Sequence, residues 1–190
     1  MPLFLLDRDG VLVVNRPDNI KAPADLDLIP GAAEAIARLN RAGYTVAICT
    51  NQSEVARGAM TKAQLDAVHD ALNERLRGVG GQIDDILVCT VSRKCPWLKP
   101  SGGMLREAVR RYGAHAFQTA FVGDQSDDLK AAFRAGCRRV LVRTGLGLKT
   151  LERGFADYLQ PVAVFDDLAA AIEAELRYGT FPSAVPVTPG

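Results

Sequence analysis

The sequence has almost no net charge and no long apolar run. Its 23 basic and 22 acidic residues leave a formal net charge of +1. Proteins that bind nucleic-acid backbones are normally strongly basic, so no nucleic-acid partner is expected. No apolar stretch approaches the roughly 18 residues that a membrane span requires, so no membrane association is expected either. The first residues also lack the basic-then-apolar layout of a signal peptide, and we therefore expect a cytoplasmic protein.

Cysteine is also scarce, with Cys49, Cys89, Cys95 and Cys137 as the four in 190 residues. Such usage is typical of reduced thiols in the cytoplasm. Cys49 and Cys137 lie in or beside apolar, strand-like runs, so we interpret both as small core residues. The length suits one domain, and 48% hydrophobic with 24% charged residues is typical of a soluble globular protein.

Residues 3–11 contain the most informative pattern of the chain. Four apolar residues are followed at once by Asp7 and Asp9, one residue apart, and then by Gly10. This pattern predicts a short buried strand that ends in a reactive turn. Side chains two apart in an extended segment point the same way, so Asp7 and Asp9 are expected to share one face. Two such carboxylates repel each other unless they share a cation or a proton.

Strand-like runs and helical patterns alternate along the whole chain. Strands are predicted at residues 3–6, 44–49, 86–91, 120–122, 139–142 and 162–165. Helices are predicted at residues 32–41, from Thr61 to Leu76, at 103–112, from Ser126 to Gly136 and at 168–176. Thr61 and Ser126 are the expected N-caps, and His69 is expected to face solvent. The alternation predicts an α/β fold, with an open and mostly parallel sheet covered by helices on both faces.

Two segments show neither pattern. Residues 12–29 are mixed in character, and we interpret them as a loop or flap over the site that is too short for a second domain. Residues 178–190 carry three prolines and little that could form a core. We therefore expect one domain over residues 1–177 and a poorly ordered tail over residues 178–190.

Asp7, Thr50 and Asp124 are each predicted at the carboxyl end of a strand, where ligands of such folds bind. The set suits the hydrolysis of phosphate esters, which requires a nucleophile, charge neutralisation and a proton for the leaving group. Asp7 is the candidate nucleophile, through an aspartyl-phosphate, because a covalent intermediate splits one difficult step into two. Asp9 is the candidate acid that protonates the leaving oxygen and the base that then activates water.

The same ends offer ligands for a cation and for phosphate. Mg²⁺ prefers oxygen ligands, and Asp7 and Asp124 are the candidate carboxylates. Thr50 and Asn51 could donate hydrogen bonds to phosphate oxygens, and Lys99 would place a cation against the transferring group. The alternative for Lys99, taken alone, is a solvated loop lysine.

Four segments, in order, resemble the four motifs of the haloacid dehalogenase-like hydrolase superfamily: Asp7-Arg8-Asp9-Gly10, Thr50-Asn51-Gln52-Ser53, Lys99-Pro100 and Gly123-Asp124-Gln125-Ser126-Asp127-Asp128. The resemblance spans residues 3–150 and implies a Rossmann-like fold. It implies that Asp7 is the nucleophile, that Asp9 is the acid and base, and that Thr50 and Lys99 bind phosphate. It also implies Mg²⁺ ligation by Asp7, Asp124 and the backbone carbonyl of Asp9, with Asp128 holding Lys99.

Residues 50–58, with the sequence Thr-Asn-Gln-Ser-x-x-Ala-Arg-Gly, are similar to the subgroup of D,D-heptose 1,7-bisphosphate and histidinol-phosphate phosphatases. These are small enzymes without a large cap domain, and the short segments between the motifs agree with that. The similarity implies a Mg²⁺-dependent phosphomonoesterase that acts on a small phosphorylated metabolite, with heptose 1,7-bisphosphate as the expected substrate. It also implies that Arg57 contacts substrate or phosphate. A monomer is expected.

The sequence departs from this subgroup in the loop before Lys99. Members usually carry a structural zinc site with four ligands, of which only Cys89 and Cys95 remain. Structural zinc is nearly always four-coordinate, so no zinc is expected. The arginine that relatives often place before the motif lysine is replaced by Leu98.

Three charged residues bear on the substrate pocket. Arg93 and Lys94 either restore positive charge near a second phosphate or form an exposed basic pair. Glu54 adds a negative group where relatives commonly have glycine.

Three other functions stay open. The nearest is a histidinol-phosphate phosphatase. A receiver-type module also places acidic residues, Thr and Lys at strand ends, but it gives no reason for Asp9 and would hold a stable aspartyl-phosphate without turnover. The third is a degenerate relative that binds substrate without hydrolysing it, against which the intact Asp7, Asp9, Lys99 and Asp124 argue.

Overall fold

The computed structural model describes residues 2–91, 93 and 95–179. Its strands are β1 (Leu3–Leu6), β2 (Thr45–Asn51), β3 (Asp85–Cys89), β4 (Ala120–Gly123), β5 (Arg138–Val142) and β6 (Val162–Phe165). Its α-helices are α1 (Ala32–Arg41), α2 (Lys62–Arg77), α3 (Gly103–Arg111), α4 (Ser126–Ala135), α5 (Gly147–Arg153) and α6 (Leu168–Tyr178). Short 3₁₀ helices are η1 (Pro23–Asp25), η2 (Ala116–Gln118) and η3 (Asp157–Leu159).

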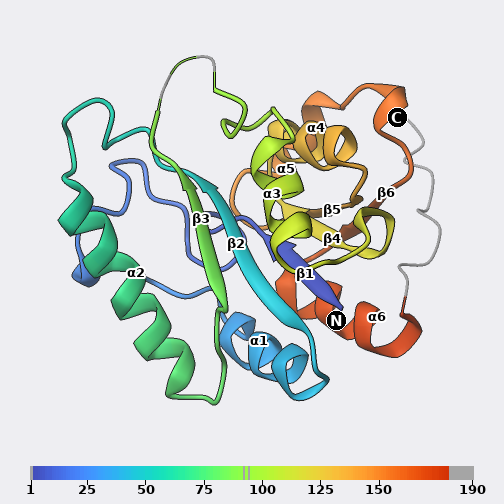
Figure 1. Ribbon diagram of the computed structural model, residues 1–190, viewed down its shortest axis with the longest axis horizontal. Coiled ribbons are helices and arrows are strands. Elements are labelled where there is room, and N and C mark those ends of the chain that lie inside the picture. Colours follow the sequence, from blue (N-terminus) through green and yellow to red (C-terminus); the bar gives the residue numbers. More distant parts are fainter. Residues whose placement is uncertain (1, 92, 94, 180–190) are drawn as a thin grey trace.

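The strands form one sheet in the order β3-β2-β1-β4-β5-β6, and every neighbouring pair is parallel. The chain starts in the middle of the sheet, moves outward to β3, and then returns to β4 beside β1 before moving outward to β6 (Figure 1). The predicted fold class is thus confirmed. The order reverses between β1 and β4, and ligands of open parallel sheets bind at the carboxyl ends of strands at such a reversal.

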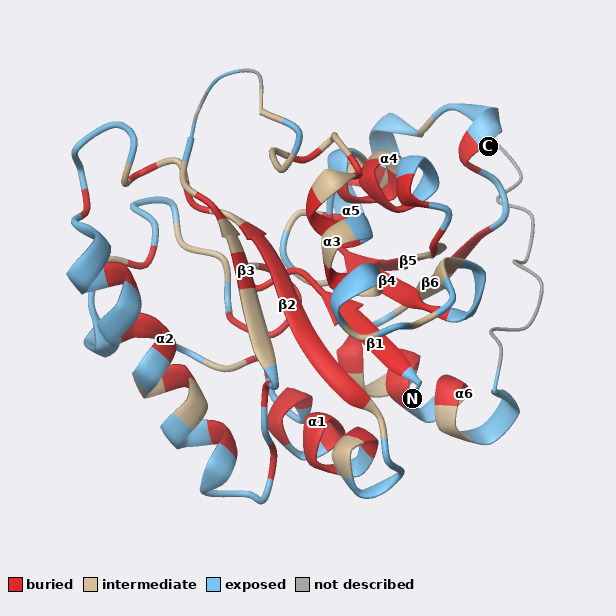
Figure 2. Ribbon diagram, viewed as in Figure 1, coloured by how far each residue is buried: buried red, intermediate tan, exposed pale blue. Residues whose placement is uncertain are grey.

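Both faces of the sheet are buried, which explains why its strands read as apolar runs (Figure 2). Successive residues of β1 face opposite layers. Phe4 and Leu6 belong to the core cluster that includes α1, α2 and α6, whereas Leu3 and Leu5 belong to the cluster that includes α3 and α4. The side chains at the end of β1 are therefore held by a strand that is packed on both sides.

The predicted elements are all present, with shifted ends. Strand β2 continues to Asn51, and β3 ends at Cys89 instead of residue 91. Cys49 and Cys137 are buried in the core, as expected. Helix α5 was not predicted, because its seven residues are too few for a clear helical period.

Two predictions about single residues are wrong. His69 was expected to face solvent but is buried, with only 8% of its surface exposed, because its ring meets the Arg8 side chain. Ser126 was expected to cap α4, but the N-cap is Gln125, whose backbone is extended, while Ser126 is already helical. Thr61 is the N-cap of α2 and forms the predicted capping box with Gln64.

Residues 12–29 contain no helix or strand other than η1, as predicted for a loop. The segment is anchored, because Val13 pairs with Leu28 and the Arg75 guanidinium of α2 donates to the carbonyl of Pro23 at 3.2 Å. At the other end of the chain, α6 includes Tyr178, which was predicted to begin the tail. The rest of the predicted tail, from residue 180 onward, lies outside the described residues.

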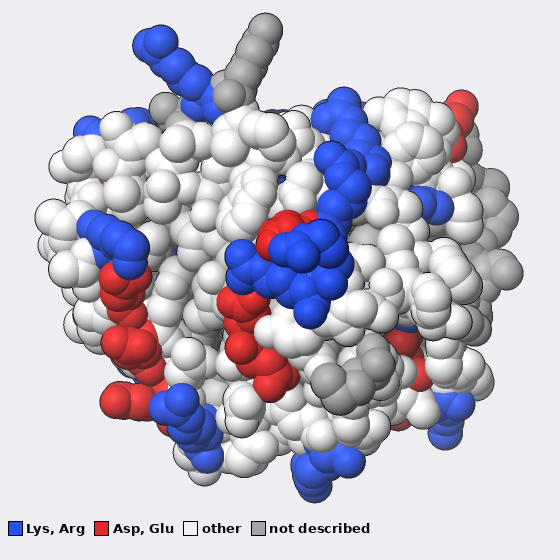
Figure 3. Space-filling view, in the orientation of Figure 1, with Lys and Arg blue, Asp and Glu red and all other residues white. Residues whose placement is uncertain are grey.

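Charged side chains of both signs lie side by side over α3 on the face shown in Figure 3. There Glu107 pairs with Arg110 at 2.7 Å and with Arg111 at 3.0 Å, and Arg111 also pairs with Asp85 at 2.9 Å. In the described part of the chain, no helix is long and apolar enough to cross a membrane.

Candidate active site

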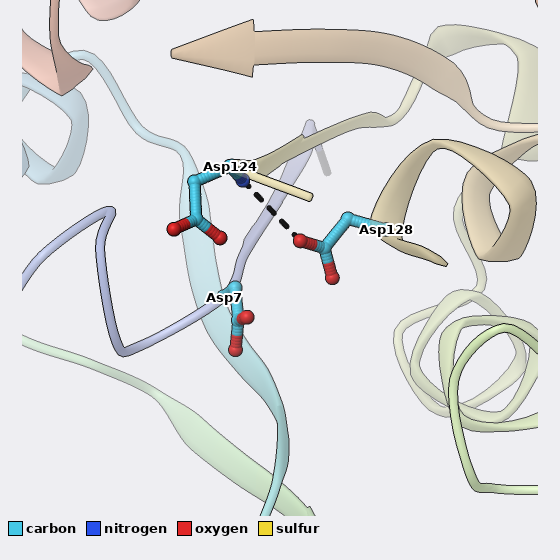
Figure 4. Close-up of side chains that lie close together, drawn as sticks. All are labelled: Asp7, Asp124 and Asp128. Carbon is cyan, nitrogen blue, oxygen red and sulfur yellow. Dashed lines mark hydrogen bonds between the residues drawn. The ribbon is translucent and has the colours of Figure 1, made fainter. Parts of the chain in front are cut away.

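Three aspartates meet at the carboxyl ends of β1 and β4. Asp7 follows β1, and its backbone N–H donates to the carbonyl of Val122 in β4 at 2.9 Å. Asp124 follows β4, and Asp128 lies in the first turn of α4. One carboxylate oxygen from each of Asp7, Asp124 and Asp128 lies within 4.8 Å of the other two (Figure 4). Parallel pairing of the two strands therefore places two sequence motifs more than a hundred residues apart in one cluster.

Lys99 lies inside this cluster. Its Nζ is 2.8 Å from Asp7 Oδ2 and 2.8 Å from Asp128 Oδ1, and its side chain is only 3% exposed. The second oxygen of Asp128 accepts the backbone N–H groups of Asp124 at 3.2 Å and Gln125 at 3.0 Å. Burial alone would lower the pKa of Lys99, but the carboxylates of Asp128 and Asp7 outweigh it and raise that pKa. Lys99 is therefore charged and fixed between the two carboxylates, and it is not a solvated loop lysine.

Negative charge exceeds positive charge in the cluster. Burial raises the pKa of Asp7 to about 6, opposed by Lys99 and reinforced by the Asp128 carboxylate. Burial, together with Asp128, raises the pKa of Asp124 to about 7. Three carboxylates and one ammonium group leave an excess of negative charge that a bound cation would neutralise.

The surroundings of Asp124 fit a hard divalent cation. Asp124 Oδ2 accepts the backbone N–H of Leu146 at 2.7 Å, while Oδ1 is buried and has no hydrogen-bond partner among the described residues. Gly10 and Gly145 both have positive φ and border this carboxylate, and an added Cβ would lie 2.1 Å and 2.2 Å from its Oδ2. Buried carboxylate oxygens with a free coordination position are the donors that Mg²⁺ prefers.

The carboxylate of Asp9 lies outside this cluster. It accepts from the Arg8 guanidinium, with Nη2 at 2.9 Å from Oδ2, and from Gln52 Nε2 at 2.9 Å. The strand ends at Leu6 and the chain turns at Arg8, so the alternation of an extended segment does not continue to Asp9. The expectation that Asp7 and Asp9 share one face therefore cannot rest on strand alternation and stays a prediction, although the Asp9 carboxylate is near enough to contribute to the raised pKa of Asp7.

The end of β2 supplies the other predicted phosphate ligands. Thr50 is buried, and its Oγ1 accepts from Gln52 Nε2 at 2.9 Å, which leaves the hydroxyl proton free to donate. The amide of Asn51 has a different contact from the one predicted. Its Nδ2 donates to the backbone carbonyl of Lys99 at 3.1 Å, and its Oδ1 accepts the Lys99 N–H at 3.1 Å. Asn51 therefore ties the Lys99 loop to the end of β2.

Arg57 is separate from the aspartate cluster. Its side chain is 58% exposed and pairs with Glu54, which is itself buried. Glu54 Oε1 also accepts from Asn19 Nδ2 at 3.0 Å, which links the loop after β2 to the loop after β1. Arg93 is exposed, and Lys94 lies outside the described residues.

Cys89 and Cys95 flank the loop that leads to Lys99. Cys89 Sγ lies 3.9 Å from the carbonyl of Val91, and Cys95 Sγ accepts from the backbone N–H of Trp97 at 3.5 Å. Burial raises the pKa of the Cys89 thiol. Among the described residues, the aspartate cluster is the one group of three or more potential metal ligands.

Two residues near the site were not identified from the sequence. Gln52 links the carboxylate of Asp9 to the hydroxyl of Thr50. Its position within the second motif was a usable signal, but the motif alone does not say which way the amide points. His69 contacts Arg8 from α2, and no local pattern in the sequence connects the two residues.

Comparisons with known proteins agree with this geometry. Residues 4–75 match the family described as haloacid dehalogenase-like hydrolase, and residues 97–171 match a family described as HAD-hydrolase-like. The D-glycero-beta-D-manno-heptose-1,7-bisphosphate 7-phosphatase of Pseudomonas aeruginosa is 42% identical over 177 residues, covering 92% of this chain and 98% of that protein. The protein of the same name from Bordetella bronchiseptica is 41% identical, covering 93% of this chain and 99% of that protein.

Solved structures give the same result. The crystal structure of D,D-heptose 1,7-bisphosphate phosphatase from B. bronchiseptica, complexed with magnesium and phosphate, superposes with a TM-score of 0.89 at 41% identity. It covers 93% of this chain and 99% of that chain. The D,D-heptose 1,7-bisphosphate phosphatase from Burkholderia thailandensis superposes with a TM-score of 0.73 at 35% identity, with the same coverage.

Proposed function

Because the chain belongs to the haloacid dehalogenase-like hydrolases, in the D,D-heptose 1,7-bisphosphate phosphatase subgroup, we propose that it is a Mg²⁺-dependent phosphatase. Its proposed substrate is D-glycero-D-manno-heptose 1,7-bisphosphate, from which it removes the 7-phosphate. The chemistry is supported by one observation above the others, the buried cluster in which Lys99 lies 2.8 Å from both Asp7 and Asp128. The substrate is supported by the shared name of relatives that span nearly the whole chain.

In the proposed first step, a carboxylate oxygen of Asp7 attacks the phosphorus of the 7-phosphate. The bond between phosphorus and the sugar oxygen breaks, and Asp9 gives its proton to that oxygen. The products of this step are the dephosphorylated sugar hydroxyl and a phosphorylated Asp7. In the second step, water attacks the same phosphorus while Asp9 accepts its proton, and inorganic phosphate leaves with Asp7 regenerated.

The remaining residues bind and orient the transferring group. Lys99 neutralises charge on the phosphoryl oxygens, and the hydroxyl of Thr50 donates to one of them. Asp7, Asp124 and the backbone carbonyl of Asp9 would hold Mg²⁺, which lowers the repulsion between the anionic phosphate and the carboxylates. Asp128 holds Lys99, and Asn51 is assigned to hold the backbone of Lys99.

We assign Arg57 to the mouth of the site, where it would meet a distal group of the substrate. Its exposed guanidinium is anchored by the buried carboxylate of Glu54, and Glu54 is fixed in turn by Asn19. This arrangement offers a charge to a second phosphate and limits the freedom of a long side chain.

The proposal is tested by phosphate release from a panel of sugar phosphates, sugar bisphosphates and histidinol phosphate, with and without Mg²⁺. We expect strong turnover of heptose 1,7-bisphosphate that depends on Mg²⁺. Preferred turnover of histidinol phosphate would replace the substrate but keep the chemistry. No turnover of any ester, together with a stable aspartyl-phosphate after incubation with acetyl phosphate, would favour a receiver-type module instead.

Three further properties belong to this proposal. Cys89 and Cys95 supply two thiols where a structural zinc site needs four ligands, so elemental analysis of the purified protein should find no stoichiometric zinc. One zinc per chain would overturn this assignment.

We also propose a monomer that acts in carbohydrate metabolism in the cytoplasm, a compartment that suits the four free thiols.

A further inference from the structure

Arg8 is a fully buried cation beside the proposed acid and base. Its side chain is 1% exposed, although arginine is rarely found inside proteins unless it is paired. Arg8 Nε and Nη2 donate to Asp9 Oδ1 at 3.2 Å and 3.1 Å, and Nη2 also donates to Asp9 Oδ2 at 2.9 Å. The guanidinium thus donates hydrogen bonds to both oxygens of the Asp9 carboxylate, the group proposed to exchange a proton with the substrate.

The far side of the guanidinium is held by His69, from the middle of α2. Arg8 Nη1 lies 3.2 Å from His69 Nε2, and both side chains are buried. Arginine has only donors, so Nε2 must be the acceptor and the ring must carry its proton on Nδ1. Burial, reinforced by the Arg8 charge, lowers the pKa of His69 to about 4, which keeps the ring neutral and able to accept.

The three side chains form a chain of contacts from α2 to the site. An arginine side chain has many rotamers. Its Nε and Nη2 bind Asp9, so Nη1 on the opposite edge of the guanidinium needs a separate partner. His69 fixes that edge by a hydrogen bond whose loss would leave a buried donor without a partner. We propose that His69 is a positioning residue, which through Arg8 holds the Asp9 carboxylate in the place from which it protonates the leaving group.

This assignment rests on the proposed function, because it presumes that Asp9 acts as the acid. A merely structural role for His69 is the alternative, since a buried residue of α2 also contributes to packing. The two roles predict different effects on substrates whose leaving groups differ in their need for a proton. An alkoxide departs only with a proton, whereas p-nitrophenolate departs readily without one. Misplacing Asp9 therefore slows the first chemical step for an alkyl phosphate and spares it for an aryl phosphate.

The experiment compares His69→Leu, which removes the acceptor, with His69→Gln, whose Oε1 lies the same number of bonds from Cβ as the lost Nε2. Val68→Ala is the packing control, because Val68 is the buried neighbour in α2 and lies in its core cluster. For each protein, kcat/KM is measured with heptose 1,7-bisphosphate and with p-nitrophenyl phosphate. The value of kcat/KM reports the steps up to the release of the leaving group and excludes hydrolysis of the phosphorylated Asp7.

We expect His69→Leu to lower kcat/KM about 10-fold for the sugar phosphate and less than about 2-fold for p-nitrophenyl phosphate, a partial loss of general acid catalysis. His69→Gln and Val68→Ala should change the ratio of kcat/KM for the sugar phosphate to kcat/KM for p-nitrophenyl phosphate by less than about 2-fold, since neither removes the acceptor.

Equal losses on both substrates in His69→Leu, or no loss on either, would overturn the assignment while leaving the phosphatase proposal intact. If the unaltered protein hydrolyses neither ester, the proposed function fails and the assignment fails with it. Should His69→Leu not fold, His69→Met removes the same acceptor with a more adaptable side chain, and the same outcomes apply.

Discussion

At the scale of single residues, the site depends on the balance of charge around Lys99. One ammonium group lies 2.8 Å from two carboxylates, and Asp124 completes a cluster in which acids outnumber bases. An anionic substrate would be repelled by such a site unless a cation joined it. The same excess of negative charge keeps Lys99 protonated. The residues thus supply a fixed cation for the phosphoryl group and an excess of negative charge that a metal ion would neutralise.

Asp7→Asn tests the assignment of the nucleophile. An amide oxygen is a poor nucleophile, so we expect hydrolysis to fall by at least about 10³-fold. The fold should survive, because Asn is close in size to Asp and Lys99 keeps its pair with Asp128. Turnover is measured with heptose 1,7-bisphosphate, and folding by thermal unfolding. Substantial residual turnover in a folded variant would remove Asp7 from this role.

His69 gives a prediction about stability and pH. Its pKa is about 4 in the folded protein against 6.5 for the ordinary group, so the unfolded chain binds the extra proton first. The folded state therefore loses stability as the pH falls from about 6.5 towards 4, by about 2 kcal/mol between pH 7 and pH 5. His69→Gln lacks this titration and should lose about 2 kcal/mol less over the same range.

The measurement is the free energy of unfolding in urea at pH 7 and pH 5 for both proteins. All other titrating groups are common to the pair and cancel in the difference. His115→Gln replaces an exposed histidine at the N-cap of η2 and is the matched control for the substitution itself. Equal pH dependence in the His69→Gln and unaltered proteins would show that His69 is not held neutral.

At the scale of elements, the sequence predicts the strands better than the contacts between their ends. Apolar runs predict β1 to β6 because both faces of a parallel sheet are buried. The motifs after β1, β2 and β4 predict an active site because they contain acidic and hydroxyl residues at strand ends. The contacts that orient the site join distant segments. Arg8 and His69 are 61 residues apart, and Asn51 and Lys99 are 48 apart. No local period encodes such pairs, which is why His69 was placed on the surface and Asn51 was assigned only to phosphate.

Asn51→Ala tests how the Lys99 loop is held. The variant loses both hydrogen bonds to the Lys99 backbone, so the ammonium group should become less well placed against the phosphoryl group. We expect kcat to fall about 10-fold or more and stability to fall by about 1–3 kcal/mol. The readouts are steady-state kinetics and urea unfolding.

Asn40→Ala is the matched control for this variant. Asn40 Oδ1 accepts the backbone N–H of Gln82 at 2.8 Å, so its loss also breaks a bond between a side-chain amide and the backbone, far from Lys99. The control should lose stability but keep kcat. If both variants keep full activity at equal stability, Asn51 has no role in placing Lys99.

At the scale of the whole molecule, topology brings the site together. The chain enters the sheet at its centre, so β1 has β2 on one side and β4 on the other, and the segments that follow all three strands meet at one edge (Figure 1). Helices pack on both faces and leave that edge for ligands. The scaffold therefore tolerates an uncompensated acidic cluster, since the two core layers supply stability that the cluster itself does not.

Binding of Mg²⁺ should consequently stabilise the entire fold. The unfolded chain does not hold Asp7 and Asp124 together, so a cation that binds the cluster binds only the folded state. At 100 times its dissociation constant it adds about 2.7 kcal/mol, which for a chain of this size raises the melting temperature by roughly 5–10 °C. Asp124→Asn should lose this response and, without metal, should melt no lower than the unaltered protein, because it removes a buried charge whose Oδ1 has no partner among the described residues. Asp66→Asn is the control, an exposed acid of α2 paired with Lys62 at 2.6 Å, and it should keep the full response. A shift of equal size in all three proteins would place the binding of Mg²⁺ elsewhere on the molecule.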